Sequence, residues 1–141
     1  MEIREADLDD VSEIVPLINQ LGYEVTSELI QTKLTNFSTT PIDAVLVAVH
    51  QGLIIGVISC HLTSLFHQAG LSGRITSLVI DKNHQGLGAG RALVQAAEEF
   101  FINSGCIKSE VTSGDHRLEA HEFYQSCGYK LDERRLLKMY S

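Results

Sequence analysis

The sequence predicts a single α/β domain spanning residues 1–141, with helices flanking a central mixed sheet that is mostly antiparallel. Short runs rich in β-branched residues alternate with stretches whose apolar residues recur at helical spacing. Between residues 75 and 101, a strand, a glycine-rich turn and a helix follow one another directly. A chain of 141 residues can build one hydrophobic core and is too short for two.

The chain begins with a predicted short strand at residues 3–6 and an amphipathic helix that Gly22 ends. Three acidic residues could cap the start of this helix: Asp7, Asp9 and Asp10. Pro16 lies inside the helical pattern and has no backbone N–H. We therefore expect a kink or a break at Pro16.

A second helix is predicted to start at Thr26 or Ser27 and to end before the polar run at residues 38–41. Two strands follow, at residues 44–50 and 53–61. Gln51-Gly52 between them predicts a tight hairpin turn.

The second half of the chain predicts a β-α-β unit: a strand at 75–80, a helix at 88–103 and a strand at 106–112. A further helix is expected at residues 118–126. The tail, residues 129–140, alternates enough to predict a last strand or a hairpin arm.

Composition excludes several functional classes. The net charge is −7 and no basic stripe is present, which argues against nucleic acid binding. No run of eighteen apolar residues could cross a membrane, and the N-terminus does not resemble a secretion signal. Three cysteines at no metal-binding spacing indicate a reducing, cytoplasmic setting and no metal site. An acidic surface favours a cationic ligand, such as an amine or polyamine, through electrostatic steering.

The glycine-rich turn between the strand at 75–80 and the next helix predicts an anion site. Free backbone N–H groups and the positive end of a helix dipole meet there, as phosphate binding requires. The spacing fits neither a dinucleotide fingerprint nor a P-loop. It fits Q/R-x-x-G-x-G/A through Gln85, Gly88 and Gly90. Here the chain resembles the GNAT superfamily of N-acetyltransferases, whose pyrophosphate loop for acetyl-coenzyme A has this pattern.

A second stretch, residues 117–129, resembles the C-terminal signature of the same superfamily, N-x-x-A-x-x-F-Y-x-x-x-G-F. Five residues fall in register: Ala120, Phe123, Tyr124, Gly128 and Tyr129. The resemblance covers residues 46–139 well and the first forty loosely. It implies a GNAT-like fold in which the strands at 75–80 and 106–112 splay apart to form a cofactor-binding β-α-β unit.

The resemblance also implies roles for individual residues. The backbone N–H of Leu78 would stabilise the acetyl carbonyl oxygen, and Tyr124 would protonate the leaving thiolate. Acetyl-coenzyme A, the implied co-substrate, would contact a larger set: Leu78, Val79, Ile80, Gln85, Gly86, Leu87, Gly88, Ala89, Gly90, Arg91 and Tyr124. Arg91 could equally be a solvated helix residue. Tyr23 lies on the segment that covers the acceptor site in this family, so it is a candidate substrate contact.

No obvious general base emerges from the sequence. The family often has a glutamate on the central strand, but residues 74–80 contain no carboxylate. The residues expected on one face of that strand are Arg74, Thr76 and Leu78. Glu110 on the neighbouring strand is the best titratable substitute, followed by His61, His116 and a water chain. Arg117 replaces the asparagine that is usual in the family, which leaves its role open.

These observations favour an acetyl-coenzyme A-dependent N-acetyltransferase acting on a primary amine, most simply that of a small molecule. Two other functions remain open: acetylation of a protein lysine or N-terminus, and a non-catalytic module that binds acyl-coenzyme A. A homodimer is compatible with the sequence. The sequence does not identify the acceptor.

Overall fold

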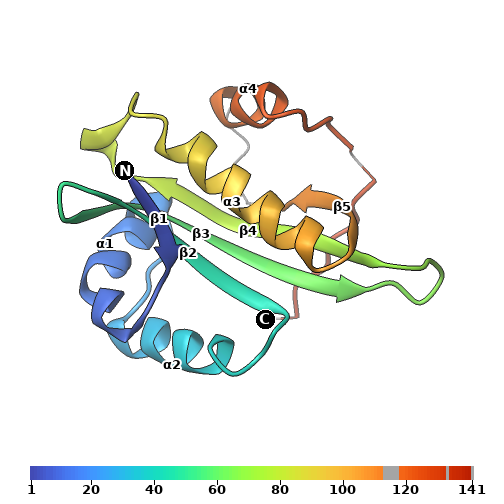
Figure 1. The fold of residues 1–141 in the computed structure, drawn as a ribbon, viewed down its shortest axis with the longest axis horizontal. Helices are drawn as coiled ribbons and strands as arrows, with labels where there is room; N and C mark the ends of the chain where they lie inside the picture. The colour runs from blue at the N-terminus through green and yellow to red at the C-terminus, as the bar shows by residue number, and fades with distance from the viewer. Residues whose placement is uncertain (113–117, 133, 141) are drawn as a thin grey trace.

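A computed structural model describes residues 1–112, 118–132 and 134–140 of the protein. Its strands are β1 (Glu2–Glu5), β2 (Asp43–His50), β3 (Leu53–Ser64), β4 (Leu71–Ile80) and β5 (Cys106–Val111). Its helices are α1 (Val11–Leu21), α2 (Ser27–Phe37), α3 (Ala89–Asn103) and α4 (Leu118–Ser126). The strands form one sheet in the order β1-β2-β3-β4-β5, antiparallel except for the parallel pair β4–β5 (Figure 1). The predicted α/β fold with a mostly antiparallel mixed sheet is confirmed.

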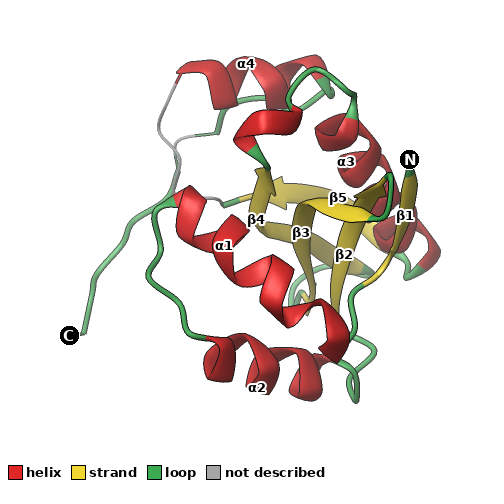
Figure 2. Ribbon diagram, turned by 90° about the vertical axis from the view of Figure 1, so that its left-hand side faces the viewer, coloured by secondary structure: helices red, strands yellow, loops and turns green. Residues whose placement is uncertain are grey.

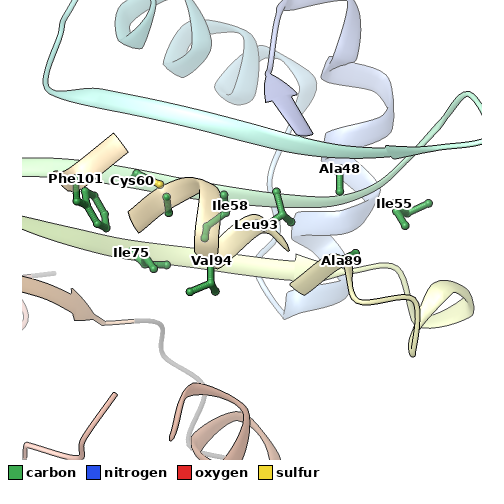
Figure 3. Packing of buried hydrophobic residues seen from close by; sticks show 10 residues of the cluster. Ala48, Ile55, Ile58, Cys60, Ile75, Ala89, Leu93, Val94 and Phe101 are labelled. Atoms are coloured by element: carbon green, nitrogen blue, oxygen red, sulfur yellow. The ribbon is translucent and has the colours of Figure 1, made fainter. Parts of the chain in front are cut away.

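Helices cover both faces of the sheet (Figure 2). One face packs against α1 and α2, where Ile14, Leu17 and Leu34 meet Val57 and Val79. The other face packs against α3, whose buried residues form the larger core, shown from close by in Figure 3. Side chains from α4 join that larger core at its margin. Because side chains alternate along a strand, β2, β3 and β4 each supply both cores.

The larger core needs a glycine on β4. A Cβ on Gly73 would lie 2.4 Å from ring atoms of Phe101, which is fully buried on α3. No real Cβ approaches a ring so closely, so any larger residue would displace the helix. Gly73 thus lets α3 pack directly onto the backbone of β4.

Strand β4 changes its pairing with both neighbouring strands halfway along its length, next to the candidate site. The β3–β4 register shifts at Ser59, leaving Thr76 as an extra residue on β4. On the other side, the parallel ladder with β5 ends at Ile75, after which the Thr112 N–H donates to the Ile75 carbonyl oxygen at 2.9 Å. Within the described residues nothing pairs with β4 beyond Ile75 on that side. The edge of β4 from Thr76 to Ile80 is therefore open on the side where the described part of β5 ends.

The N-terminal elements largely match their sequence signals. Asp7 caps the short 3₁₀ turn that precedes α1, accepting from the Asp9 N–H at 2.9 Å. Gly22 ends α1 at a φ of +113°. The break expected at Pro16 is wrong, because α1 runs from Val11 to Leu21 with Pro16 inside it. Proline removes a single i→i−4 hydrogen bond here, and the apolar face that packs on the sheet holds the helix together.

Later boundaries show two departures from prediction. Strands β3 and β4 form a longer hairpin than expected, since Thr63 and Ser64 pair with Ser72 and Leu71. The predicted last strand or hairpin arm is wrong, because residues 129–132 and 134–140 contain no strand. Apolar side chains of this tail, among them Leu136 and Met139, are exposed. An alternating pattern stabilises a strand only where a neighbouring strand pairs with it.

Candidate active site

The glycine loop has an open, anion-accepting geometry. Gly86 and Gly88 both have φ of +81°, and Gly88 is the residue before α3 begins. The first helical hydrogen bond runs from the Ala92 N–H to the Gly88 carbonyl oxygen at 3.0 Å, so the preceding N–H groups have no partner within the helix. Nothing lies within 4 Å of where a Cβ on either glycine would stand. The loop therefore leaves room for an anion beside a helix N-terminus.

Two glutamine side chains hold the loop to the end of β4. Gln85 donates to the Ile80 carbonyl oxygen at 3.1 Å, and Gln20 at the end of α1 donates to the same oxygen at 2.8 Å. Gln20 also accepts from the Lys82 N–H at 3.1 Å. The contribution of Gln20 was missed in the sequence, because it depends on a contact 60 residues away.

The last two residues of the predicted loop motif face α4. A Cβ on Gly90 would lie 3.2 Å from the Phe123 ring, so Gly90 permits close packing of α4 on α3. The Arg91 guanidinium donates to the Ser126 hydroxyl at 3.0 Å, at the end of α4. Gly90 and Arg91 therefore join the two helices, and a phosphate contact for either stays a prediction.

The backbone N–H of Leu78 points away from β3, toward the edge of β4 that is open beyond the end of β5. The Ile80 carbonyl faces away from β3, since it accepts from Gln20 and Gln85. Backbone groups two residues apart on a strand point the same way, so the Leu78 N–H shares this direction. The extra residue Thr76 also reverses side-chain alternation, so Leu78 packs on the α3 side and does not share a face with Arg74 and Thr76 as predicted. The side chains of Val79 and Ile80 belong to the two cores.

A cavity of about 810 Å³ lies beside β5, and both Tyr124 and Glu110 line it. Residues of β4, β5, α4 and the tail line it. Among the described residues of its lining, Arg74, Lys108, Lys130, Arg134 and Arg135 are basic, and Glu110 and Asp132 are acidic. Basic side chains thus outnumber acidic ones in this described lining, although the whole chain carries −7.

Tyr124 packs its ring edge-to-face against Phe123 and Tyr129, with centroids 5.3 and 6.1 Å apart. Burial, reinforced by the Glu98 carboxylate, raises the pKa of the Tyr129 phenol well above its usual range. Tyr129 is therefore a poorer proton donor than an ordinary tyrosine. The role of Tyr124 as the general acid stays a prediction.

Glu110, the predicted base, lies among cations. Its carboxylate contacts Arg74 at 3.4 Å and Lys108 at 3.5 Å, and it accepts from the Ser72 hydroxyl at 3.4 Å. Tyr23 follows α1 and is half exposed, and it does not line this cavity. The roles of Glu110 and Tyr23 stay predictions.

A polar network crosses the sheet on the α1–α2 face next to the extra residue of β4. Asp43 on β2 binds the His61 Nδ1 at 2.8 Å, and the His61 Nε2 lies 2.7 Å from the Thr76 hydroxyl. The Ser59 hydroxyl then contacts Thr76 at 2.7 Å and Ser77 at 2.5 Å. Of these residues, sequence analysis singles out only His61 as a candidate base. The rest of the network could not be predicted, because it joins three strands through a register shift.

The remaining sequence predictions concern two residues outside the described parts of the chain, a cysteine, metal binding and membrane spans. His116 and Arg117 lie outside the described residues. Burial raises the pKa of the Cys60 thiol to about 12, which keeps it unreactive. No three His, Cys, Asp or Glu side chains gather as a metal site within residues 1–112, 118–132 and 134–140. None of the described helices is long and apolar enough to cross a membrane.

Known proteins resemble this chain in sequence and in fold. The aminoalkylphosphonate N-acetyltransferase of Salmonella typhimurium is 29% identical over 97% of this chain and 90% of that protein. The glucosamine 6-phosphate N-acetyltransferase of Trypanosoma brucei brucei is 30% identical over 60% of this chain and 56% of that protein. The structure of glucosamine-6-phosphate N-acetyltransferase from Arabidopsis thaliana shares the fold, with a TM-score of 0.84 at 23% identity over 99% of this chain and 98% of that one.

Residues 12–129, which include the glycine loop, β4, β5 and Tyr124, match the acetyltransferase (GNAT) family. A match of this extent covers most of the domain. The protein therefore belongs to the GNAT family and is an N-acetyltransferase.

Proposed function

We propose that the protein transfers an acetyl group from acetyl-coenzyme A to the primary amine of a small molecule that also carries a phosphate or phosphonate group. The observation that carries this proposal is the cavity around Tyr124, beside β5, whose described lining is rich in cations. Arginine and lysine bind phosphate oxygens through charge-assisted hydrogen bonds. The named relatives act on an aminoalkylphosphonate and on glucosamine 6-phosphate, which both combine an amine with such a group.

The chain's residues fit acetyl-coenzyme A on structural grounds. The open positions at Gly86 and Gly88 leave space for phosphate oxygens against the N-terminus of α3. The unpaired edge of β4 beyond Ile75 could pair with the amide groups of the pantetheine arm, as a peptide pairs with a sheet edge. Both features lie at the same end of β4, so one extended molecule can reach them together.

Bound acetyl-coenzyme A supplies an acetyl group activated as a thioester. The Leu78 N–H would stabilise negative charge on the carbonyl oxygen, an effect typically worth about 2.7–4 kcal/mol for one preorganised donor. Tyr124 would give its phenolic proton to the departing thiolate. Cations of the cavity, Arg74 and Lys108 among them, would hold the acceptor's anionic group and so position its amine.

This assignment differs from the cationic acceptor that the net charge favours. The net charge of the protein affects the rate at which a charged molecule encounters it, whereas the charges that line the cavity affect how tightly the bound molecule is held. At physiological salt, charges more than about 8 Å apart are largely screened, so the local lining has the larger effect on binding.

An acceptor screen that follows thiol release from acetyl-coenzyme A tests the proposal. Matched pairs separate its parts: 2-aminoethylphosphonate against ethylamine, and glucosamine 6-phosphate against glucosamine. A polyamine such as spermidine represents a cationic acceptor. We expect kcat/KM to be highest for a phosphorylated or phosphonylated amine. Faster turnover of the partner that lacks the anionic group, or of spermidine, would overturn the acceptor class.

A further inference from the structure

The network on the α1–α2 face has a direction that hydrogen-bond chemistry fixes. Asp43 as a carboxylate can only accept, so the His61 Nδ1 must carry the proton of their 2.8 Å contact. In the neutral form of His61, Nε2 can only accept, so the Thr76 hydroxyl donates to it in that form. The lone proton of each following hydroxyl points the same way: Ser59 donates to Thr76, and Ser77 donates to Ser59. The Ser77 hydroxyl oxygen, at the end of the network opposite Asp43, can thus still accept a hydrogen bond through its lone pairs.

That accepting end lies beside the reacting centre of the proposed function. Ser77 directly precedes Leu78, whose N–H faces the open edge of β4 beyond the end of β5. Ser59, Thr76 and Ser77 are partly exposed, so a small molecule can approach this end of the network. The side chains of Asp43 and His61 at the other end are also partly buried, 17% and 25% exposed. The Phe37 ring packs edge-on against His61 at 5.6 Å.

We propose that this network removes the proton from the acceptor's ammonium group, with His61 as the final proton acceptor and Asp43 as the residue that positions it. The inference rests on the proposed function. The ammonium N–H bond breaks as Ser77 takes that proton, Ser77 passes its own to Ser59, Ser59 to Thr76, and Thr76 to the His61 Nε2. The products are a neutral amine, ready to attack the thioester carbonyl, and an imidazolium that faces the Asp43 carboxylate.

Charged groups around His61 come from three strands. Asp43 on β2 and Arg74 on β4 are its cross-strand partners, and Glu110 on β5 is in turn the partner of Arg74. Asp43 favours the imidazolium, Arg74 opposes it, and Glu110 is already engaged by Arg74 and Lys108. Glu110 is the competing base, so its variant belongs in the same experiment.

The first test compares pH profiles of kcat/KM for the wild type, His61→Gln and Glu110→Gln with an amine that the wild type acetylates. We expect His61→Gln to lower kcat/KM by about a hundredfold or more and to abolish the ascending acidic limb that belongs to His61. His50→Gln, a substitution at the far end of β2, is the matched control and should behave as the wild type. An acidic limb that survives in His61→Gln but disappears in Glu110→Gln overturns the proposal and assigns the base to Glu110.

The second test needs neither a variant nor activity. In the ¹⁵N NMR spectrum of the histidine-labelled wild type, neutral His61 should be protonated at Nδ1 and unprotonated at Nε2. The opposite tautomer would overturn the proposal, because the hydroxyls would then run in the other direction. If the wild type acetylates no amine, the proposed function fails, and the tautomer still decides whether the network has the inferred direction.

Discussion

A single methyl group on Gly88 should separate the role of the glycine loop in binding from its role in the fold. Gly88 has φ of +81°, and nothing lies within 4 Å of a Cβ built there. Gly88→Ala therefore creates no clash in the free protein. Its only cost is the strain of alanine in the left-handed region, about 1–2 kcal/mol, which the stiffer unfolded chain partly offsets. We expect a net loss of about 1 kcal/mol, or about 3–4 °C in Tm.

The effect on acetyl-coenzyme A should be larger, because the methyl group enters the space left for phosphate oxygens. Loss of one charge-assisted hydrogen bond costs about 1.5–3 kcal/mol. Since 1.4 kcal/mol corresponds to a factor of ten, the Kd should rise by about tenfold to a hundredfold.

Gly52→Ala supplies the matched control for Gly88→Ala. Gly52 lies in the β2–β3 turn with φ of +78° and nothing within 4 Å of its Cβ position, so its substitution carries the same strain far from the loop. The assay is isothermal titration of acetyl-coenzyme A into both variants, after circular dichroism has shown that both are folded. Equal Kd values for the two variants would refute the assignment of the loop.

Three further predictions follow from the structure. Tyr124→Phe should lower kcat by about a hundredfold or more with little change in the Kd for acetyl-coenzyme A. If the chemical step limits the rate and the variant still turns over at the wild-type rate, Tyr124 is a packing residue. The Arg4 guanidinium donates to the two carboxylate oxygens of the nearly buried Asp10 at 2.8 and 2.9 Å and so lowers the pKa of Asp10. This pair stabilises the folded protein fully at pH values above the pKa that Asp10 has in the unfolded chain. The contribution is lost as the pH falls through the lower pKa of Asp10 in the folded protein. In urea titrations Arg4→Met should therefore be less stable at pH 7 by about 1.5–3 kcal/mol, and the difference should shrink below about pH 4; a pH-independent difference would contradict this. Gly73→Ala should cost about 1–3 kcal/mol because its Cβ would overlap the Phe101 ring, and an unchanged urea midpoint would show that α3 can move without cost.

Local signals predicted the elements well wherever they acted within a few residues. Thr26 caps α2, accepting from the Leu29 N–H at 3.1 Å, and Gln51-Gly52 forms the turn between β2 and β3. The glycine loop also lies between β4 and α3 as its motif predicted. Each of these depends on backbone chemistry that the residue itself dictates.

Features that depend on distant pairing were not predictable in the same way. Alternation in the tail did not show whether any strand would accept it, and no strand formed among its described residues. The extra residue Thr76 moved Leu78 to the other face of β4, because a bulge breaks the period of two on which face assignments rest. The cavity brings Arg74 and Lys108 together with residues of the tail, so average composition could not reveal it.

The most direct test of the central claim is a single-turnover reaction with enzyme, acetyl-coenzyme A and 2-aminoethylphosphonate, analysed by mass spectrometry. Thiol release and N-acetylated product should appear at the same rate and in equal amounts, and ethylamine should yield far less product. Thiol release without an acetylated amine would mean that the site only hydrolyses the thioester. Equal product from ethylamine would contradict a site built for an anionic acceptor.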